Sequence, residues 1–361
     1  MRIAVEATAA CRPRRSGIGV YTVRLIEALL AGPSRAAGDR LRVGYRLSRW
    51  RERRLRFLPP QAPPFWIQEP LLPPLPPFDV VHGTDGRVPH WRGVARVATV
   101  HDIGPLLFED FSSLRFRERV RSFLHRLTTH CHVIIADSEA TRQDFLRLFD
   151  FPPERLAVVH LGVEGAFRPL TPDQAAPVLQ HYGLNPGYLF FAGDISRRKN
   201  IRRLIEGYAA SAAGRKRPLV LAGSLSFGGE ELLSVIPAMG LEERVRLLGF
   251  VPDAHLPALY AGAGAFLFPT RYEGFGMPVL EAMACGVPVV AGTRGSVPEI
   301  AGGHAVLVDP DDPLAIAAGI EGALALPPEA LEAARHHASA FTWQRCAERT
   351  RAVYEQALAL R

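Results

Sequence analysis

Short runs of β-branched and aromatic residues alternate with helical patterns along most of this 361-residue chain. In its first half, strands are expected at residues 2–7, 78–83, 94–102 and 132–138. In its second half, strands are expected at residues 188–193, 218–223, 244–250, 264–269 and 287–292. Repeated strand–helix units imply right-handed crossovers and a parallel sheet with helices on both faces. The alternation therefore predicts an α/β fold built from parallel sheets.

The alternation is interrupted near RPLTPD (168–173), which is typical of a linker. For a chain of 361 residues, two domains of ordinary size are the natural expectation. We expect one parallel-sheet domain at 1–168, a second at 169–341, and a terminal helix within 342–361 that Thr342 caps. Ligands of such sheets bind at the carboxyl ends of the strands, so a cleft between the two domains is the expected site.

Composition excludes several classes of protein. No apolar run reaches ~18 residues, so a transmembrane helix is not expected. The N-terminal MRIAVEATAACRPRR passes from a strand-like run into a basic turn, unlike a signal peptide. The four cysteines are scattered without a C-x-x-C pair, which favours a cytoplasmic location and gives no zinc signature. Prolines crowd residues 58–77, so an irregular loop is expected there.

Charge is unevenly distributed along the chain. Residues 1–170 hold 26 arginines, no lysine and 17 acidic side chains, a formal charge of +9, whereas the remainder has 17 basic and 19 acidic side chains, or −2. A basic first half suggests an anionic partner. RLSRWRERRLRF (46–57) mixes arginines with apolar side chains, which suits an anionic membrane surface, and the helical pattern at 113–130 adds more cations. A nucleic-acid-binding or regulatory protein is an alternative, although no nucleic-acid motif is visible.

RYEGFGMPVLEAMACGVPVVAG (271–292) places two glutamates, Glu273 and Glu281, in a run that is otherwise largely apolar. Pro278 and Gly286 delimit a helix at 278–285, and the two glycines before it let backbone approach a ligand. Free N–H groups at such a helix start can hold an anion. Carboxylates accept hydroxyl hydrogen bonds, so the two glutamates suit a sugar and a ribose. The alternative is a salt-bridged Glu273 and a partly exposed Glu281.

Two further motifs bear on anion binding. SRRKN (196–200) follows a strand and opens a helix, so Arg198 can fork onto two phosphate oxygens while Lys199 adds a point charge. Gly17 and Gly19 stand at a strand-to-helix turn, but GIGVYT lacks the third glycine of a dinucleotide fingerprint. DPDDP (309–313) imitates a metal motif; we interpret Asp312 as a helix N-cap and expect neither a metal nor a cofactor.

The stretch PTRYEGFGMPVLEAMACGVPVVAGTRGSVPEI (269–300) resembles the E-x(7)-E segment of retaining glycosyltransferases with the GT-B fold, of the family-4 type (glycosyl transferases group 1). SGIGVYTVRLIEALL is similar to that family's first glycine loop, and VATVHDIGPLLFEDF to its histidine–aspartate segment. Six further segments match in order, among them VIIADSEATRQDF, FAGDISRRKNIRRLIEGY and FTWQRCAERTRAVYEQAL. The resemblance covers nearly the whole chain. It implies two Rossmann-like domains facing a central cleft, with 342–361 crossing back to the first.

The resemblance also implies roles for individual residues. Arg198 and Lys199 would stabilise the leaving nucleoside diphosphate, although many members have a basic residue where this chain has Asp194. His101 would line the reacting sugar, and Asp137 and Ser138 the acceptor side. The remaining donor-site residues would be Gly17, Gly19, Phe250, Val251, Glu273, Gly274, Phe275, Gly276, Met277 and Glu281.

The implied activity is retaining transfer of a hexose from a nucleotide-sugar to a saccharide or lipid-linked acceptor of a bacterial surface polysaccharide. TVHDIGPLLFEDF resembles mannosyltransferase-like members, which makes GDP-mannose the first candidate donor. A nucleotide-sugar epimerase of the same fold is the close enzymatic alternative. The implied location is the cytoplasm, with peripheral association at the inner face of the plasma membrane.

Overall fold

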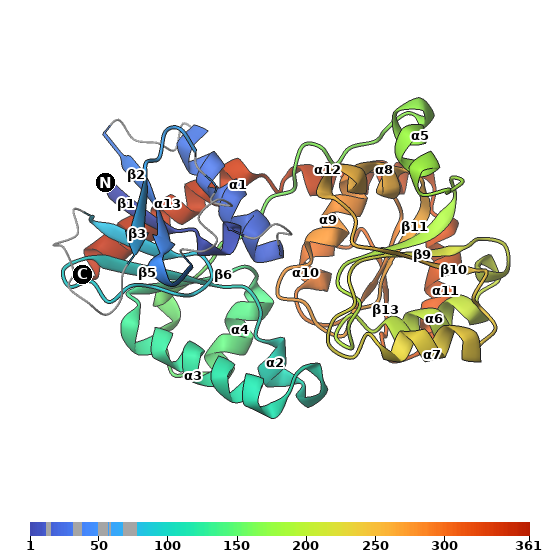
Figure 1. Ribbon diagram of the computed structural model, residues 1–361, viewed down its shortest axis with the longest axis horizontal. Helices are drawn as coiled ribbons and strands as arrows, with labels where there is room; N and C mark the ends of the chain where they lie inside the picture. The colour runs from blue at the N-terminus through green and yellow to red at the C-terminus, as the bar shows by residue number, and fades with distance from the viewer. Residues whose placement is uncertain (12–15, 32–37, 50–56, 58, 68–77) are drawn as a thin grey trace. The chain divides into compact units, whose positions relative to one another are not determined.

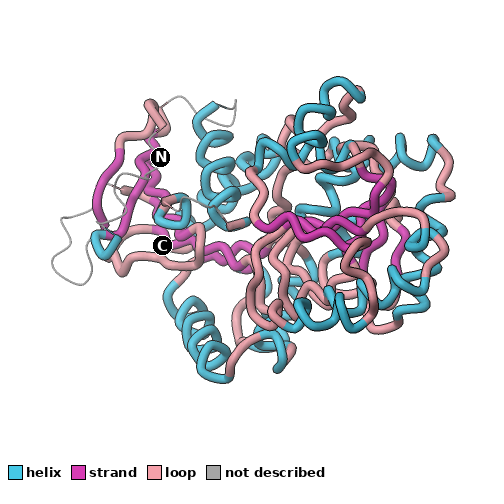
Figure 2. The backbone as a smooth tube through the Cα atoms, turned by 45° about the vertical axis from the view of Figure 1, so that its right-hand side comes forward, coloured by secondary structure: helices cyan, strands magenta, loops and turns pink. Residues whose placement is uncertain are grey.

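The computed structural model describes residues 1–11, 16–31, 38–49, 57, 59–67 and 78–361. They divide into two compact units. The first unit comprises Met1–Leu106, Leu114–Gly162 and Thr342–Arg361, and the second comprises Leu107–Ser113 and Val163–Phe341. Both ends of the chain therefore belong to the first unit (Figure 2).

The first unit contains a seven-stranded parallel sheet with the strand order β3-β2-β1-β4-β5-β6-β7. Its strands are β1 (Arg2–Glu6), β2 (Arg40–Arg46), β3 (Pro64–Ile67), β4 (Val80–Gly83), β5 (Ala95–Val100), β6 (Val133–Ala136) and β7 (Leu156–Val158). Every residue of β4 and β6 is buried, as expected for parallel strands covered by helices on both faces. The order reverses between β1 and β4, where Glu6 pairs with Gly83. This switch point is where ligands bind in open parallel sheets.

Helices cover both faces of this sheet (Figure 1). On one face, α1 (Gly17–Ala31) packs against the terminal helix α13 (Trp343–Ala359), which also contacts β4, β5 and β6. Thr342 caps α13 by accepting a hydrogen bond from the Arg345 N–H, and the Tyr354 hydroxyl lies 2.8 Å from Nδ1 of His82. On the other face lie α3 (Leu114–His130) and α4 (Glu139–Leu148). Between β5 and α3 the chain forms α2 (Gly104–Leu107).

The second unit contains a six-stranded parallel sheet with the order β10-β9-β8-β11-β12-β13. Its strands are β8 (Tyr188–Ala192), β9 (Leu219–Ala222), β10 (Val245–Gly249), β11 (Ala263–Phe268), β12 (Val289–Gly292) and β13 (Val306–Val308). The switch point lies between β8 and β11, which pair through Phe190 and Phe266.

Helices again lie on both sides of the sheet (Figure 1). On one side lie α6 (Ile201–Ala210), α7 (Glu231–Ala238) and α11 (Pro313–Leu324). On the other side lie α5 (Pro172–His181), α8 (Leu256–Ala261), α9 (Met277–Ala284) and α12 (Pro328–Ser339). The short helix α10 (Val297–Ala301) packs against α9 and β12.

The predicted α/β fold with two parallel sheets is confirmed. The irregular loop expected at 58–77 is wrong in part, because β3 occupies Pro64–Ile67. A proline is tolerated there since β3 is an edge strand and Pro64 is its first residue. Residues 58 and 68–77, and residues 50–56 of the basic stretch 46–57, lie outside the described residues.

Among the described residues, no single helix combines the length and apolar composition of a membrane span. The succession Pro313–Leu324 and Pro328–Ala359 meets those criteria only as a pair, with a bend of 101° between its parts.

Candidate functional site

The switch point of the second sheet brings together two motifs that are far apart in sequence. The loop after β8 leads through Arg198 and Lys199 into α6, and the loop after β11 leads through Glu273 into α9. Since β8 and β11 are neighbouring parallel strands, both loops leave the same edge of the sheet. The two motifs singled out from sequence therefore meet where an open α/β sheet binds its ligand.

Glu273 lies between the two cations of the SRRKN motif. Lys199 donates from Nζ to Glu273 Oε1 at 2.8 Å, and Arg198 donates from Nη1 to Oε2 at 2.7 Å and to the Tyr272 carbonyl at 3.2 Å. Lys199 and Glu273 are both buried, each 6% exposed. Burial opposes ionisation of Glu273, yet Arg198 and Lys199 together lower its pKa. The cluster is thus a compact set of charges in which two cations face one carboxylate.

Hydrogen bonds from Ser296 fix the backbone around Glu273. Ser296 donates from Oγ to the carbonyls of Glu273 (2.9 Å) and Phe275 (2.7 Å), and its N–H donates to the Glu273 carbonyl at 3.1 Å. Gly276 caps α9 with a φ of 101°, a conformation that favours glycine. Pro278 occupies the second position of α9 rather than the first, because the helix begins at Met277.

Glu281 lies apart from this cluster. Its Oε2 accepts a hydrogen bond of 2.9 Å from Tyr260 on α8, and within the described residues it forms no ion pair with Arg198 or Lys199. Burial raises the pKa of Glu281 to about 7. The same motif thus contains one carboxylate paired with cations and one held by a neutral hydroxyl. Phe250 and Val251 follow β10, where Phe250 is exposed and Val251 buried.

In the first unit, His101 and Asp137 form a hydrogen-bonded pair at the ends of β5 and β6. Nδ1 of His101 lies 2.6 Å from Asp137 Oδ2, and Nε2 lies 2.6 Å from the Thr84 carbonyl. The Thr84 carbonyl can only accept a hydrogen bond, so Nε2 carries a proton, and an ionised Asp137 accepts from a protonated Nδ1, which favours the imidazolium form of His101. Burial opposes this charge, but Asp137 and the Thr84 carbonyl raise the pKa of His101. The structure therefore joins two predicted site residues that the sequence analysis placed in separate roles.

The other predicted site residues of the first unit lie at helix starts. Ser138 is buried and caps α4, with its Oγ accepting a hydrogen bond of 3.1 Å from the Thr141 N–H. Gly17 and Gly19 lie in the first turn of α1, not in a turn before it. The N–H groups of a first helical turn have no acceptor within the helix, so an anion can still approach them there.

DPDDP forms a helix start held by arginines. Asp312 caps α11 by accepting a hydrogen bond of 2.8 Å from the Leu314 N–H, as predicted. Asp309 and Asp311 both pair with Arg294, and Asp311 also lies 3.8 Å from Arg271. Among the residues that the structure describes, no group of three or more His, Cys, Asp or Glu side chains could hold a metal ion.

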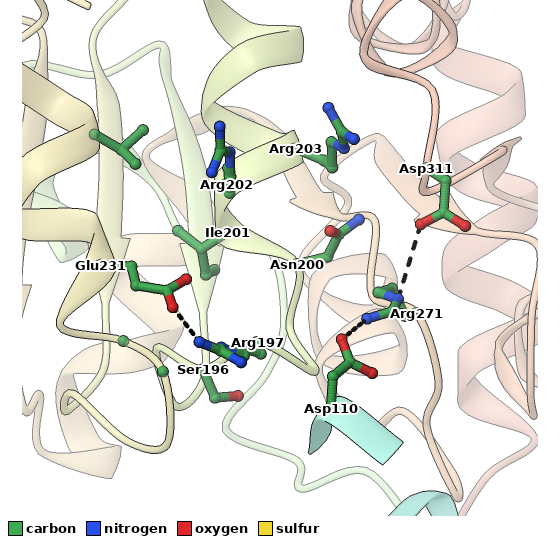
Figure 3. Close-up of a pocket in the computed structure, with 13 residues that line it drawn as sticks. Asp110, Ser196, Arg197, Asn200, Ile201, Arg202, Arg203, Glu231, Arg271 and Asp311 are labelled. Carbon is green, nitrogen blue, oxygen red and sulfur yellow. Dashed lines mark hydrogen bonds and ion pairs between the residues drawn. The ribbon is translucent and has the colours of Figure 1, made fainter. Parts of the chain in front are cut away.

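A polar pocket of about 600 Å³ lies beside the cluster in the second unit (Figure 3). It is lined by the neighbours of Arg198 and Lys199 in sequence, such as Arg197 and Asn200, and not by the two cations themselves. Figure 3 shows Arg271 between Asp110 and Asp311, and Arg197 paired with Glu231. In this pocket Arg197 and Arg271 pair with the acids Glu231, Asp110 and Asp311, whereas Arg198 and Lys199 share the single carboxylate of Glu273, so the cluster is the more suitable anion site.

Sequence reasoning missed several residues that shape these sites. Tyr260 and Ser296 position the two motif glutamates, and Thr84 fixes His101. Glu6 is fully buried at the end of β1 in the first unit. Glu6 could have been found from sequence, because a carboxylate ends the otherwise apolar strand RIAVE. Tyr260, Ser296 and Thr84 give no such signal, since these residue types are common in loops and helices.

Comparison with known proteins agrees with this arrangement. Residues 15–166 match the model of Glycosyltransferase Family 4, and residues 181–339 match that of Glycosyl transferases group 1. The O-antigen chain mannosyltransferase B of Escherichia coli is 35% identical over 285 residues, covering 76% of this chain and 74% of that protein.

Two solved structures show the same fold. Sucrose-phosphate synthase from Thermosynechococcus elongatus has a TM-score of 0.77 and 21% identity, with 99% of both chains covered. HepE from Anabaena, in complex with UDP and glucose, has a TM-score of 0.74 and 20% identity, with 96% of this chain and 97% of that chain covered. With its two parallel-sheet units and both family segments, the chain belongs to the GT-B glycosyltransferases of the family-4, group 1 type.

Proposed function

We propose that this glycosyltransferase moves a hexose from a nucleotide-sugar to a saccharide or lipid-linked acceptor, with retention of anomeric configuration. The observation that carries the proposal is the Arg198–Lys199–Glu273 cluster at the switch point of the second sheet. Nucleotide-sugar cleavage releases a diphosphate, so its transition state needs cations that are in place beforehand. The cluster supplies two.

Glu273 has a double role in this proposal. It compensates Lys199 and Arg198 while the site is empty, which keeps two cations together at low cost. Each carboxylate oxygen accepts one hydrogen bond from a cation and keeps a further lone pair. Those lone pairs suit the hydroxyl groups of a hexose. Glu281 would accept hydrogen bonds from the ribose, and the backbone of 249–251 would contact the base.

Arg198→Ala tests the role of the cluster. We expect kcat to fall by a factor of about a hundred or more, because a donor that stabilises developing charge is worth about 2.7–4 kcal/mol. Arg202→Ala is the matched control: Arg202 lies four positions further on, is exposed and pairs with Glu206 on its own helix. Equal loss of activity in both variants would contradict the assignment of Arg198.

Retention is a separate part of the proposal. It rests on family membership; both ring nitrogens of His101 are already engaged by Asp137 and Thr84, so His101 would assist a front-face attack through its charge and not by a direct hydrogen bond to the sugar. The anomeric configuration of the first product, read by NMR before it mutarotates, tests this directly. An inverted product would overturn the retaining mechanism. Release of free nucleotide without any acceptor would favour the epimerase alternative.

GDP-mannose is the proposed donor, and the name of the Escherichia coli relative, a mannosyltransferase, supports it. The neighbour HepE was solved with UDP and glucose, so UDP-glucose is the rival. A melting-shift screen across nucleotide-sugars decides between them. DNA belongs in the same screen, because a shift with DNA alone would favour the nucleic-acid-binding alternative.

We also propose that transfer requires no metal ion. The support is chemical: Arg198 and Lys199 can neutralise a diphosphate, while Asp309 and Asp311, the acids of DPDDP, pair with arginines. Turnover should persist in excess EDTA. Loss of turnover that magnesium or manganese restores would refute this part of the proposal.

The proposed acceptor is a lipid-linked saccharide of a bacterial surface polysaccharide, by analogy with the O-antigen relative. The proposed location is the cytoplasm, at the inner face of the plasma membrane, and α3 supports it with exposed Leu114 and Phe116 among its arginines. Vesicles with 30% anionic lipid should sediment the protein, and Phe116→Ser should weaken sedimentation. Equal sedimentation with neutral vesicles would contradict an electrostatic contribution.

A further inference from the structure

We infer that the first unit holds a pocket for a phosphate group, formed by the loop after β4, the end of β2 and one side of α3. This inference rests on the proposed function, because it names the chemical class of the acceptor: a phosphate-bearing saccharide. The pocket has a volume of about 230 Å³. Its polar side chains belong to Arg46, Arg87, His90, Arg126 and His130, and its lining includes no acidic residue.

The pocket lies near the edge of the sheet where a ligand is expected. Arg46 ends β2, and Gly86 and Arg87 follow β4 by a few residues, so both walls come from the carboxyl ends of strands on either side of β1. Two residues before Gly86, Thr84 accepts the hydrogen bond from His101. A group bound in the pocket would therefore adjoin the loop that holds His101.

The arginines are only loosely paired. Arg126 is exposed and forms no ion pair with any described residue, and Arg87 lies 3.3 Å from Asp85. Arg46 has a carboxylate neighbour, Glu6, but its Nε lies 3.6 Å from Oε1, beyond hydrogen-bond distance. Arg126 and Arg46, whose side chains have no partner within hydrogen-bond distance among the described residues, are available to an added anion, while Arg87 is already paired with Asp85.

Glu6 is a weak counter-charge for Arg46. It is fully buried, its Oε1 accepts a hydrogen bond of 3.1 Å from the Thr8 N–H, and its Oε2 is buried without a hydrogen-bond partner. Burial, with the nearby Asp85, raises the pKa of Glu6 to about 8. This shift favours the protonated form of Glu6, which leaves three arginines and Asp85 as the charges around the pocket.

Two histidines, His90 and His130, shape the pocket and offer hydrogen-bonding groups. The rings of His90 and His130 lie with centroids 3.4 Å apart. Burial, with repulsion from His90 and Arg96, lowers the pKa of His130 to about 4, so that ring is neutral at pH 7. Three arginines against one carboxylate leave an excess of about two positive charges, which matches a phosphate monoester or diphosphate.

The test is a calorimetric titration of the protein with three probes: inorganic phosphate, a hexose 1-phosphate and farnesyl diphosphate. Saturating nucleoside diphosphate is present throughout, so that Arg198 and Lys199 are occupied. Arg126→Ala should weaken binding about tenfold, the equivalent of one charge-assisted hydrogen bond. Arg121→Ala is the matched control, because it removes the same charge from α3 five residues away, on another side of the helix.

The two variants should melt at the temperature of the native protein, since both arginines are exposed. Tighter binding of hexose 1-phosphate than of farnesyl diphosphate would identify a soluble sugar phosphate as the source of the group, and the reverse order a lipid-linked diphosphate. An affinity of Arg126→Ala within twofold of native for all three probes would overturn the inference. An equal loss in Arg121→Ala would also overturn it, by showing a general charge effect.

Failure of the inference can be told apart from failure of the proposed function. If no nucleotide-sugar shifts the melting temperature and none is turned over, the proposed function is wrong, whatever Arg126 does. If nucleotide-sugars bind and are turned over but Arg126→Ala leaves phosphate binding and the KM of a phosphorylated acceptor unchanged, only the pocket is wrong.

Discussion

A buried glutamate lies at the switch point of each of the two sheets, and the surroundings of the two glutamates shift their pKa values in opposite directions. Glu273 in the second unit receives hydrogen bonds of 2.7 and 2.8 Å from two cations, which hold its pKa below the usual range. Glu6 in the first unit has one cation at 3.6 Å and one oxygen without a partner, and its pKa rises to about 8. Burial raises the pKa of both carboxylates, so the number and distance of the neighbouring cations decide in which direction each pKa moves.

The largest effect is expected when the well-paired carboxylate is removed. Glu273→Gln leaves Lys199 buried without its counter-ion, which should destabilise the second unit by about 3–5 kcal/mol. Tryptophan fluorescence would report on the first unit, because that unit contains Trp66, Trp91 and Trp343. Hydrogen exchange of the β8 and β11 amides therefore measures the stability of the second unit.

Glu206→Gln is the control for this experiment. Glu206 also pairs with two cations, Arg202 and Arg203, but these are exposed residues of its own helix. We expect a loss within about 1 kcal/mol. If Glu273→Gln is no more destabilising than Glu206→Gln, leaving buried Lys199 without its counter-ion does not destabilise the second unit as predicted.

The second prediction concerns the poorly paired carboxylate. Between its ordinary pKa of 4.5 and its raised pKa of about 8, Glu6 binds a proton in the folded state that it lacks in the unfolded state. The first unit should therefore lose stability as pH rises through this window, on the order of 2–4 kcal/mol by pH 9. Glu6→Gln should abolish that loss and be more stable than the native protein at pH 9.

Tryptophan fluorescence during urea unfolding measures this, because the described tryptophans report on the first unit. Asp79→Asn serves as a control of opposite sign, since Arg2 lowers the pKa of Asp79 and ionisation stabilises the fold. If the free energy of unfolding changes with pH in the same way in the native protein and in Glu6→Gln, the raised pKa of Glu6 is contradicted.

The third prediction extends the comparison to Glu281, whose partner is a neutral hydroxyl. Glu281→Ala should weaken nucleoside diphosphate binding about tenfold or more, through lost ribose contacts worth about 1.5–3 kcal/mol. Tyr260→Phe removes the same internal hydrogen bond without removing the carboxylate, so its affinity should stay within about threefold of native. An unchanged dissociation constant in Glu281→Ala would refute the ribose assignment.

The smallest effect is expected at His101. Asp137→Asn replaces the carboxylate that faces Nδ1, so the pKa of His101 should fall by about one unit or more, or roughly 1.4 kcal/mol per unit. NMR titration of the His101 ring protons, in the native protein and in Asp137→Asn, measures it. A pKa that stays in place would mean that the Thr84 carbonyl alone holds the imidazolium.

The elements of the fold could be predicted where periodicity is strong. The β8, β9, β11 and β12 runs and the cap at Thr342 follow from local side-chain pattern and capping chemistry, and they appear where expected. Short edge strands gave weaker signals: β3 was missed because Pro64 and the prolines around it in sequence argue against regular structure. Pairing at the edge of a sheet, which the chain pattern does not encode, overrode that local preference.

The site was predicted as a set of residues but not as an arrangement. Glycines, a helix start and adjacent cations mark Arg198, Lys199 and Glu273 from sequence alone, because backbone approach and anion binding need those residue types. That Glu273 pairs with both cations, that Glu281 turns to Tyr260 and that Asp137 holds His101 depend on which strands are neighbours. These partners are 21 to 75 residues apart, so only the strand order of each sheet brings them within hydrogen-bond distance. The pKa of each buried carboxylate follows from those distances, which is why tertiary structure alone decided that the pKa of Glu273 is lowered and that of Glu6 is raised.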